Sequence, residues 1–127
     1  MRPIARTLHT IVAWLFVAAL VVQVWLAGRG VFESPTMFDA HRNLGYTLSL
    51  LTIVLFVLGL LGRMGRRPAI LAAVLFGLFI LQSVLVVMRD STPAVAALHP
   101  VNGFLILFLA IVLARDSTMM RTAPATA

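Results

Sequence analysis

Four long apolar runs alternate with short polar connections along the chain. They are Leu8–Ala27, Leu44–Leu61, Ala69–Met88 and Val101–Ala114. With flanking helical residues, each approaches the roughly 17–25 residues that a helix needs to cross the hydrocarbon core of a bilayer. Lipid offers the backbone no hydrogen-bond partners, so such runs must be helical. The pattern predicts one all-α domain, an integral membrane four-helix up-down bundle. Its helices are expected at about 7–28, 35–62, 68–89 and 93–114, with a flexible tail at 115–127.

The composition supports a membrane class. Hydrophobic residues make up 61% of the 127 residues, more than a soluble domain of this size can bury. The first run follows Arg2 and Arg6, as in a signal peptide, but it is longer than a typical signal-peptide core and no A-x-A site follows it. It is therefore expected to remain as the first helix.

The net charge of +6 is distributed unevenly across the predicted membrane. Three arginines fall on one side and seven on the other; the seven are Arg2, Arg6, Arg63, Arg66, Arg67, Arg115 and Arg121. This bias predicts that both termini and the RMGRR loop are cytoplasmic. The basic charge then indicates anionic headgroups of the lipid bilayer as partners, and no nucleic acid. The sequence has no cysteine, which excludes disulfides, iron–sulfur clusters and covalent haem attachment.

The two halves of the chain share a pattern of polar residues. The first half reads VVQVWLAGR and then ESPTMFDAHRNLG; the second reads ILQSVLVVMR and then DSTPAVAALHPVNG. In each, histidine follows proline by six residues and glycine follows histidine by four. The repeated residues are Gln23, Arg29, Pro35, His41 and Gly45, and Gln82, Arg89, Pro93, His99 and Gly103. A hydroxyl residue before proline is an ordinary helix start, and glycine is common in packed membrane helices. The shared offsets are what ordinary packing does not predict, and they indicate an internal two-helix repeat.

The repeat predicts a layer of four polar side chains. At 1.5 Å per residue, each histidine lies about 9 Å from its helix start, and Gln23 and Gln82 come to a similar depth. The second and fourth helices of an up-down bundle are diagonal across the core. His41 and His99 are therefore expected to point inward and face each other.

Two opposed imidazoles suit the axial positions of a haem iron. Gly45 and Gly103 would leave room for the macrocycle, and Gln23 and Gln82 would orient the imidazoles or bind propionates. Three arginines are expected at the rim, where propionates would emerge; they are Arg29, Arg42 and Arg89. Without cysteine, the cofactor would be non-covalent haem b.

Other polar residues fit such a site less well. A zinc or copper site would need three or four protein ligands. The remaining histidine, His9, lies a membrane thickness away and is expected near the headgroups. Asp39 is expected to be an exposed charge at the start of its helix.

HRNLGY and LHPVNG resemble the histidine segments of the haem A synthase family. Those enzymes have two four-helix halves, and paired histidines on the second and fourth helix of a half ligate haem. The resemblance implies that His41 and His99 are a ligand pair. It does not imply synthase chemistry, because this chain has one half and no clear match to the synthase glutamate. The whole chain also resembles small four-helix bacterial membrane proteins of no known activity that carry similar segments.

The sequence leaves three functions open. The protein is expected to bind haem and transfer electrons with a quinone or another redox partner, or to handle haem, without being an enzyme by itself. The same layer could instead hold a small ligand or quinone, or serve transport. It could also be structural, in a non-catalytic subunit of a membrane complex. The expected location is the bacterial cytoplasmic membrane.

Overall fold

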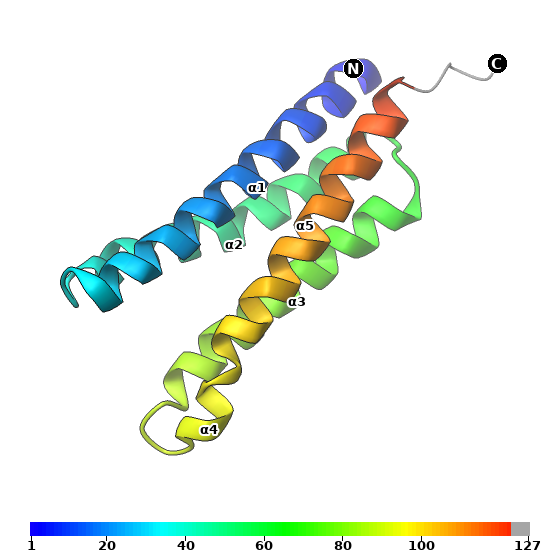
Figure 1. The fold of residues 1–127 in the computed structure, drawn as a ribbon. Coiled ribbons are helices and arrows are strands. Elements are labelled where there is room, and N and C mark those ends of the chain that lie inside the picture. Colours follow the sequence, from blue (N-terminus) through cyan, green and yellow to red (C-terminus); the bar gives the residue numbers. More distant parts are fainter. Residues whose placement is uncertain (123–127) are drawn as a thin grey trace.

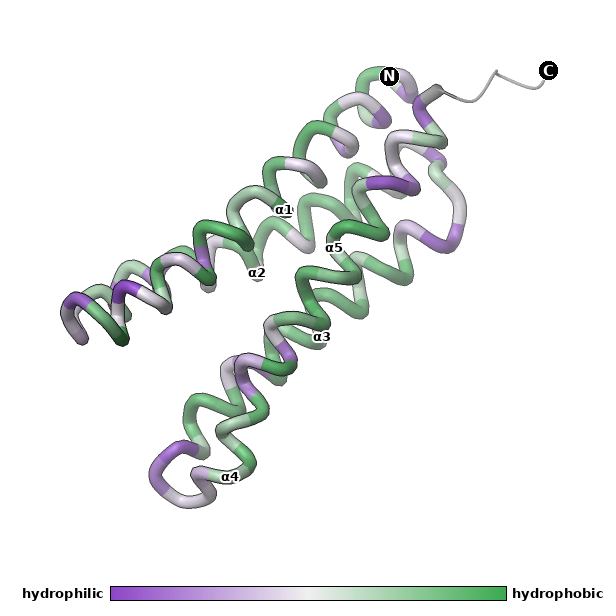
Figure 2. Tube along the Cα trace, viewed as in Figure 1, coloured by the Kyte–Doolittle hydropathy of each residue, from purple (hydrophilic) through white to green (hydrophobic). Residues whose placement is uncertain are grey.

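The chain folds into helices joined by short turns. The computed structural model describes residues 1–122, which form α1 (Arg2–Phe32), α2 (Met37–Leu61), α3 (Arg66–Val87), α4 (Pro93–Ala96) and α5 (Leu98–Thr122) (Figure 1). Four spans are long and apolar enough to cross a membrane, the fourth combining α4 with α5. Hydrophobic residues dominate their middle sections (Figure 2). The protein is an all-α membrane protein, as the apolar runs predict.

The helices form two arms, one made by α1 and α2 and the other by α3 and α5. α1 contacts α2 and α5, and α3 contacts the same two helices, so α2 and α5 lie diagonally across the bundle. The arms lie together at one end and diverge toward the other (Figure 1). The end that holds the N-terminus and the α2–α3 turn is called the basic end. The end that holds the α1–α2 turn and α4 is called the histidine end.

The core lies where the arms meet. Apolar side chains from all four long helices are fully or almost fully buried there, among them Phe16, Leu48, Leu55, Leu75, Ile106 and Leu113. Phe16 of α1 and Phe79 of α3 join the two arms, with ring centroids 6.1 Å apart. This apolar core separates polar groups at the basic end from those at the histidine end.

The observed helix ends differ from the expected ones in two places. The fourth expected helix is broken at Ala97 into α4 and α5. α5 then continues to Thr122, so the flexible tail expected from residue 115 is wrong for residues 115–122. Buried polar contacts explain the extension, because the Ser117 hydroxyl lies 2.9 Å from His9 Nδ1 and Asp116 pairs with Arg67 at 2.9 Å. The rest of the expected tail, 123–127, lies outside the described residues.

The predicted starts of the second and fourth helices are also only partly right. Thr92 is the N-cap residue of α4 and Pro93 its first residue, as predicted. α2 begins later, at Met37, and Pro35 belongs to the preceding turn. Gly30 makes this turn compact, since a Cβ atom there would lie 2.7 Å from the Phe38 ring.

Candidate functional site

A glutamine and a histidine hold α1 and α2 together near the histidine end. Gln23 Nε2 donates to the His41 carbonyl oxygen at 2.7 Å, and His41 Nδ1 lies 3.0 Å from the Gln23 carbonyl oxygen. The side chain of each residue therefore hydrogen-bonds to the backbone of the other. This reciprocal pair fixes the orientation of the imidazole relative to both helices.

The other arm repeats the arrangement. Gln82 Nε2 of α3 donates to the His99 carbonyl oxygen of α5 at 3.0 Å, and His99 Nδ1 lies 3.3 Å from the Gln82 carbonyl oxygen. The polar layer expected from the repeat is thus present, with one glutamine–histidine pair in each arm.

These contacts determine which ring nitrogen is available. A carbonyl oxygen only accepts, so the Nδ1 atom facing it must carry the hydrogen. In the neutral ring, Nε2 is then the unprotonated nitrogen of both His41 and His99. Histidines that bind metals commonly donate their other ring N–H to a backbone carbonyl in this way.

The two half-buried imidazoles approach each other across the bundle. The ring centroids of His41 and His99 are 6.1 Å apart, and the ring planes are inclined by 55°. Phe38 also meets His41 edge-on, at 6.3 Å between centroids. The diagonal placement of α2 and α5 thus brings together the two histidines that the sequence pairs.

Asn102 is a member of the layer that the repeat did not predict. Its Nδ2 donates to Gln82 Oε1 at 2.6 Å and to the Leu78 carbonyl oxygen at 2.9 Å. Asn102 lies three residues after His99, and the first half has Leu44 at that offset from His41. The signal in the sequence was an amide side chain near the start of the apolar run Val101–Ala114.

The layer is asymmetric because the first half has Leu44 at the position equivalent to Asn102. Gln82 uses both ends of its amide, whereas Gln23 Oε1 is buried and has no hydrogen-bond partner among residues 1–122. A buried acceptor without a partner is energetically unfavourable. The two pairs therefore differ in stability although their backbone contacts match.

The glycines of the repeat accommodate the glutamines. A Cβ atom at Gly45 would lie 3.0 Å from Gln23 Nε2, and one at Gly103 would lie 3.6 Å from Gln82 Nε2. The observed neighbours are thus glutamine amides, where room for a macrocycle was expected. At Gly45 the absence of a Cβ atom gives the Gln23 amide room to reach the backbone of α2, whereas a Cβ atom at Gly103 would make only ordinary van der Waals contact with Gln82.

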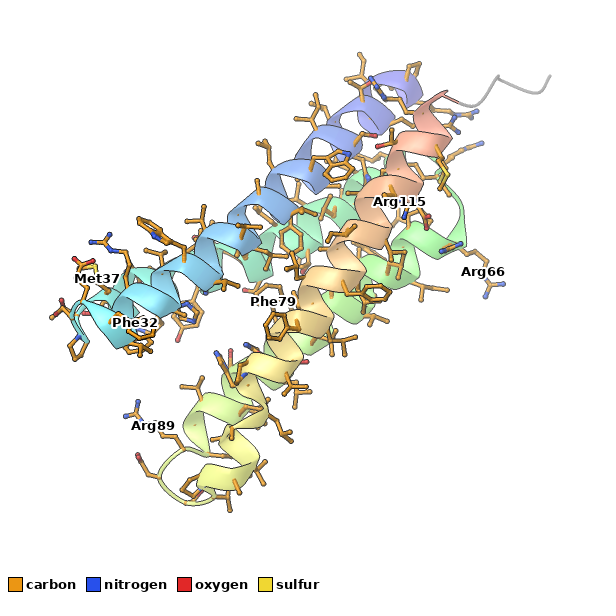
Figure 3. The ribbon with its side chains drawn as sticks, in the orientation of Figure 1. Phe32, Met37, Arg66, Phe79, Arg89 and Arg115 are labelled. Atoms are coloured by element: carbon orange, nitrogen blue, oxygen red, sulfur yellow. The ribbon has the colours of Figure 1, made fainter. Side chains whose placement is uncertain are left out.

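The three rim arginines lie at the histidine end and are bound to neighbouring acids. The ion pairs are Arg29–Glu33 at 2.6 Å, Arg42–Asp39 at 2.7 Å and Arg89–Asp90 at 3.5 Å. The Arg29 guanidinium, through its hydrogen bonds, holds the pKa of Glu33 below its usual value. Asp39 is exposed in the first turn of α2, as expected. Arg89 has the longest of the three contacts, and its side chain extends away from the helices (Figure 3).

His9 is placed differently from the expectation. It is fully buried at the basic end, where an interfacial side chain near headgroups was expected. The Ser117 hydroxyl donates to the Leu113 carbonyl oxygen at 2.6 Å, so His9 Nδ1 is the donor to that hydroxyl. Sequence reasoning missed this contact because it joins residues 108 positions apart.

The fold and the polar layer define a class: a four-helix membrane bundle in which each arm presents one imidazole to the other. Residues 23–89 match the DUF6220 family, a family of unknown function, and the chain belongs to this family. The match begins at Gln23 and ends at Arg89, so it contains the first glutamine–histidine pair and Gln82 but not His99. No curated protein and no solved structure gives a significant match to the chain.

Proposed function

We propose that the protein binds one b-type haem, with His41 and His99 as the axial ligands. The single observation that carries the proposal is the approach of the two rings, whose centroids are 6.1 Å apart. A metal held by two imidazoles lies about 2.0–2.1 Å from each nitrogen, and each centroid lies about 1.1 Å behind its nitrogen. Two ligands in line would thus have centroids about 6.3 Å apart, close to the observed separation.

The ring nitrogens support the same conclusion. Nδ1 of each histidine faces a backbone carbonyl, at 3.0 Å for His41 and 3.3 Å for His99. Nε2 of each ring is left free to donate a lone pair to a metal. The two rings therefore have the tautomer that axial ligation requires.

The ligand set also favours a porphyrin over a bare metal ion. No group of three or more His, Cys, Asp or Glu side chains able to hold a metal occurs within the described residues. Two imidazoles alone do not complete a zinc or copper site, whereas a porphyrin supplies four nitrogens of its own. The likeness of HRNLGY and LHPVNG to the histidine segments of haem A synthases points to the same pair.

The surrounding residues have supporting roles in this proposal. Gln23 and Gln82 hold the backbone of the two histidines and so fix their rings. Propionate binding by the rim arginines would require exchange of an acidic partner, and Arg89 has the weakest one. Bound haem would supply one-electron chemistry for electron transfer with a quinone or another redox partner, or be carried as cargo.

The proposed location is the bacterial cytoplasmic membrane, with the basic end in the cytoplasm. The seven arginines of the basic end support this orientation through the positive-inside bias. The haem would then lie in the outer leaflet, near partners outside the cytoplasm. A reagent that labels single cysteines introduced at the two ends of the bundle tests the orientation.

The test is an absorption spectrum of detergent-purified protein, oxidised and reduced with dithionite, before and after addition of haemin. The expected result is a Soret band with sharp reduced alpha and beta bands, lost or altered in both His41→Ala and His99→Ala. His9→Gln is the matched control and should keep the wild-type spectrum, because His9 lies beyond the apolar core. Addition of imidazole to His41→Gly should restore the spectrum.

Two results would overturn the proposal. One is a colourless protein that does not take up haemin. The other is an unchanged spectrum in both His41→Ala and His99→Ala, which would indicate nonspecific haem binding. In either case, quinone binding to the same protein would become the next measurement.

A further inference from the structure

A hollow at the basic end lies between the end of α2 and the start of α3. It has a volume of about 480 Å³ and is open to the surroundings. Its lining combines apolar side chains with arginines: Leu60, Arg63, Arg66, Ala69 and Ile70. Leu60 and Ile70 are more than half exposed, so the apolar wall faces the lipid region of the bilayer.

The two arginines of the hollow have no side-chain partner within residues 1–122, unlike Arg6 and Arg67 nearby. Arg67 pairs with Asp116 at 2.9 Å, and Arg6 donates to the carbonyl oxygens of Gly62 and Arg63. No hydrogen bond or ion pair within residues 1–122 involves the guanidinium of Arg63 or Arg66. Arg66 extends outward from the turn (Figure 3). Two unneutralised positive charges therefore border an apolar wall.

The turn beside the hollow holds Arg63 in an unusual backbone conformation. Arg63 has a φ of 48°, in the left-handed region where residues other than glycine are uncommon. The turn already uses Gly62 and Gly65, and glycine would fit position 63 with less strain. Arg63 nevertheless adopts this unfavourable conformation, and its guanidinium lies at the edge of the hollow.

We propose that this hollow binds one anionic phospholipid. The phosphate would lie between Arg63 and Arg66, and an acyl chain would follow the apolar wall formed by Leu60, Ala69 and Ile70. Charge complementarity selects the ligand, because the hollow has two unpaired cations and no acidic lining residue. The site is independent of the haem proposal, since the apolar core separates it from His41 and His99.

The experiment is lipid titration of the detergent-purified full chain, with bound lipid counted by native mass spectrometry. Phosphatidylglycerol is compared with phosphatidylcholine. Each arginine near a membrane surface strengthens the binding of anionic lipid about 5-fold, so two give a preference of about 30-fold. Arg63→Gln with Arg66→Gln should abolish this preference. Arg2→Gln with Arg115→Gln removes the same charge from the same end and should keep it.

A third variant tests the apolar wall without a change of charge. Ala69→Trp fills the hollow and should lower phosphatidylglycerol binding about 10-fold, by loss of the space for one chain. Inorganic phosphate should not compete at concentrations that saturate a free-anion site. The proposal is overturned if both double variants lose the preference equally, if Ala69→Trp binds like wild type, or if phosphate displaces the lipid.

Discussion

The unequal surroundings of Gln23 and Gln82 lead to opposite effects of the same substitution. Methionine has nearly the volume and flexibility of glutamine but makes no amide hydrogen bond. Gln82→Met removes two hydrogen bonds, one to the His99 carbonyl and one from Asn102. Such bonds contribute about 0.6 kcal/mol each in membrane bundles. We expect Gln82→Met to lower the free energy of unfolding by about 1 kcal/mol.

Gln23→Met removes one hydrogen bond and also removes a buried oxygen that has no partner. The lost bond costs about 0.6 kcal/mol. An unsatisfied buried acceptor costs about 1–3 kcal/mol, which the substitution relieves. The His41 carbonyl also lies within α2, where backbone bonding continues. We therefore expect the variant to be about 0.5–2 kcal/mol more stable than wild type.

The assay is equilibrium unfolding of the haem-free protein in dodecyl maltoside with increasing dodecyl sulfate, followed by far-ultraviolet circular dichroism. The free energies of unfolding of the two variants should differ by about 2 kcal/mol, because one substitution destabilises the protein and the other stabilises it. Asn102→Leu should resemble Gln82→Met, and combining these two should cost less than their sum. If Gln23→Met destabilises the protein as much as Gln82→Met, the interpretation of the unpartnered oxygen is refuted.

Two further predictions concern other positions. Gly103→Ala should raise stability by up to about 1 kcal/mol through helix propensity, because its Cβ meets Gln82 Nε2 at an ordinary 3.6 Å. Gly45→Ala should stabilise the protein less than Gly103→Ala, or destabilise it, because its Cβ would lie 3.0 Å from the Gln23 amide, which is already held at 2.7 Å. The free energy of unfolding is measured for both variants. Equal gains in stability would contradict the argument. Arg67→Gln removes the cation paired with the buried Asp116 carboxylate and should cost about 1 kcal/mol in the same assay, because the Arg67 side chain is largely exposed. A cost near zero would show that the carboxylate needs no cation.

The helices and the histidine layer follow from local patterns in the sequence. Apolar run length fixes the four spans, because lipid leaves the backbone no alternative to the helix. The equal offsets from Pro35 to His41 and from Pro93 to His99 predict that the two rings share a layer, and the structure brings them together. The depth calculated from the helix starts does not hold, because Pro35 precedes α2 and α4 ends before His99.

What the sequence did not predict depends on contacts between helices. The buried place of His9 follows from Ser117 of α5, far along the chain. The role of Gly45 follows from the path of the Gln23 side chain, which no spacing specifies. The helical segment beyond residue 114 likewise depends on anchors in α1 and α3. Composition alone made that segment look like a polar tail.

Each glutamine–histidine pair is contained within a single helical hairpin. Gln23 and His41 belong to α1 and α2, and Gln82 and His99 belong to α3 and α5. Each hairpin can therefore prepare its imidazole as soon as its own two helices are inserted in the bilayer. Docking of one hairpin on the other then brings the two rings to their observed separation. A ligand that bridges the rings would act as a cross-link between two independently inserted halves, so its supply would set how tightly the bundle closes.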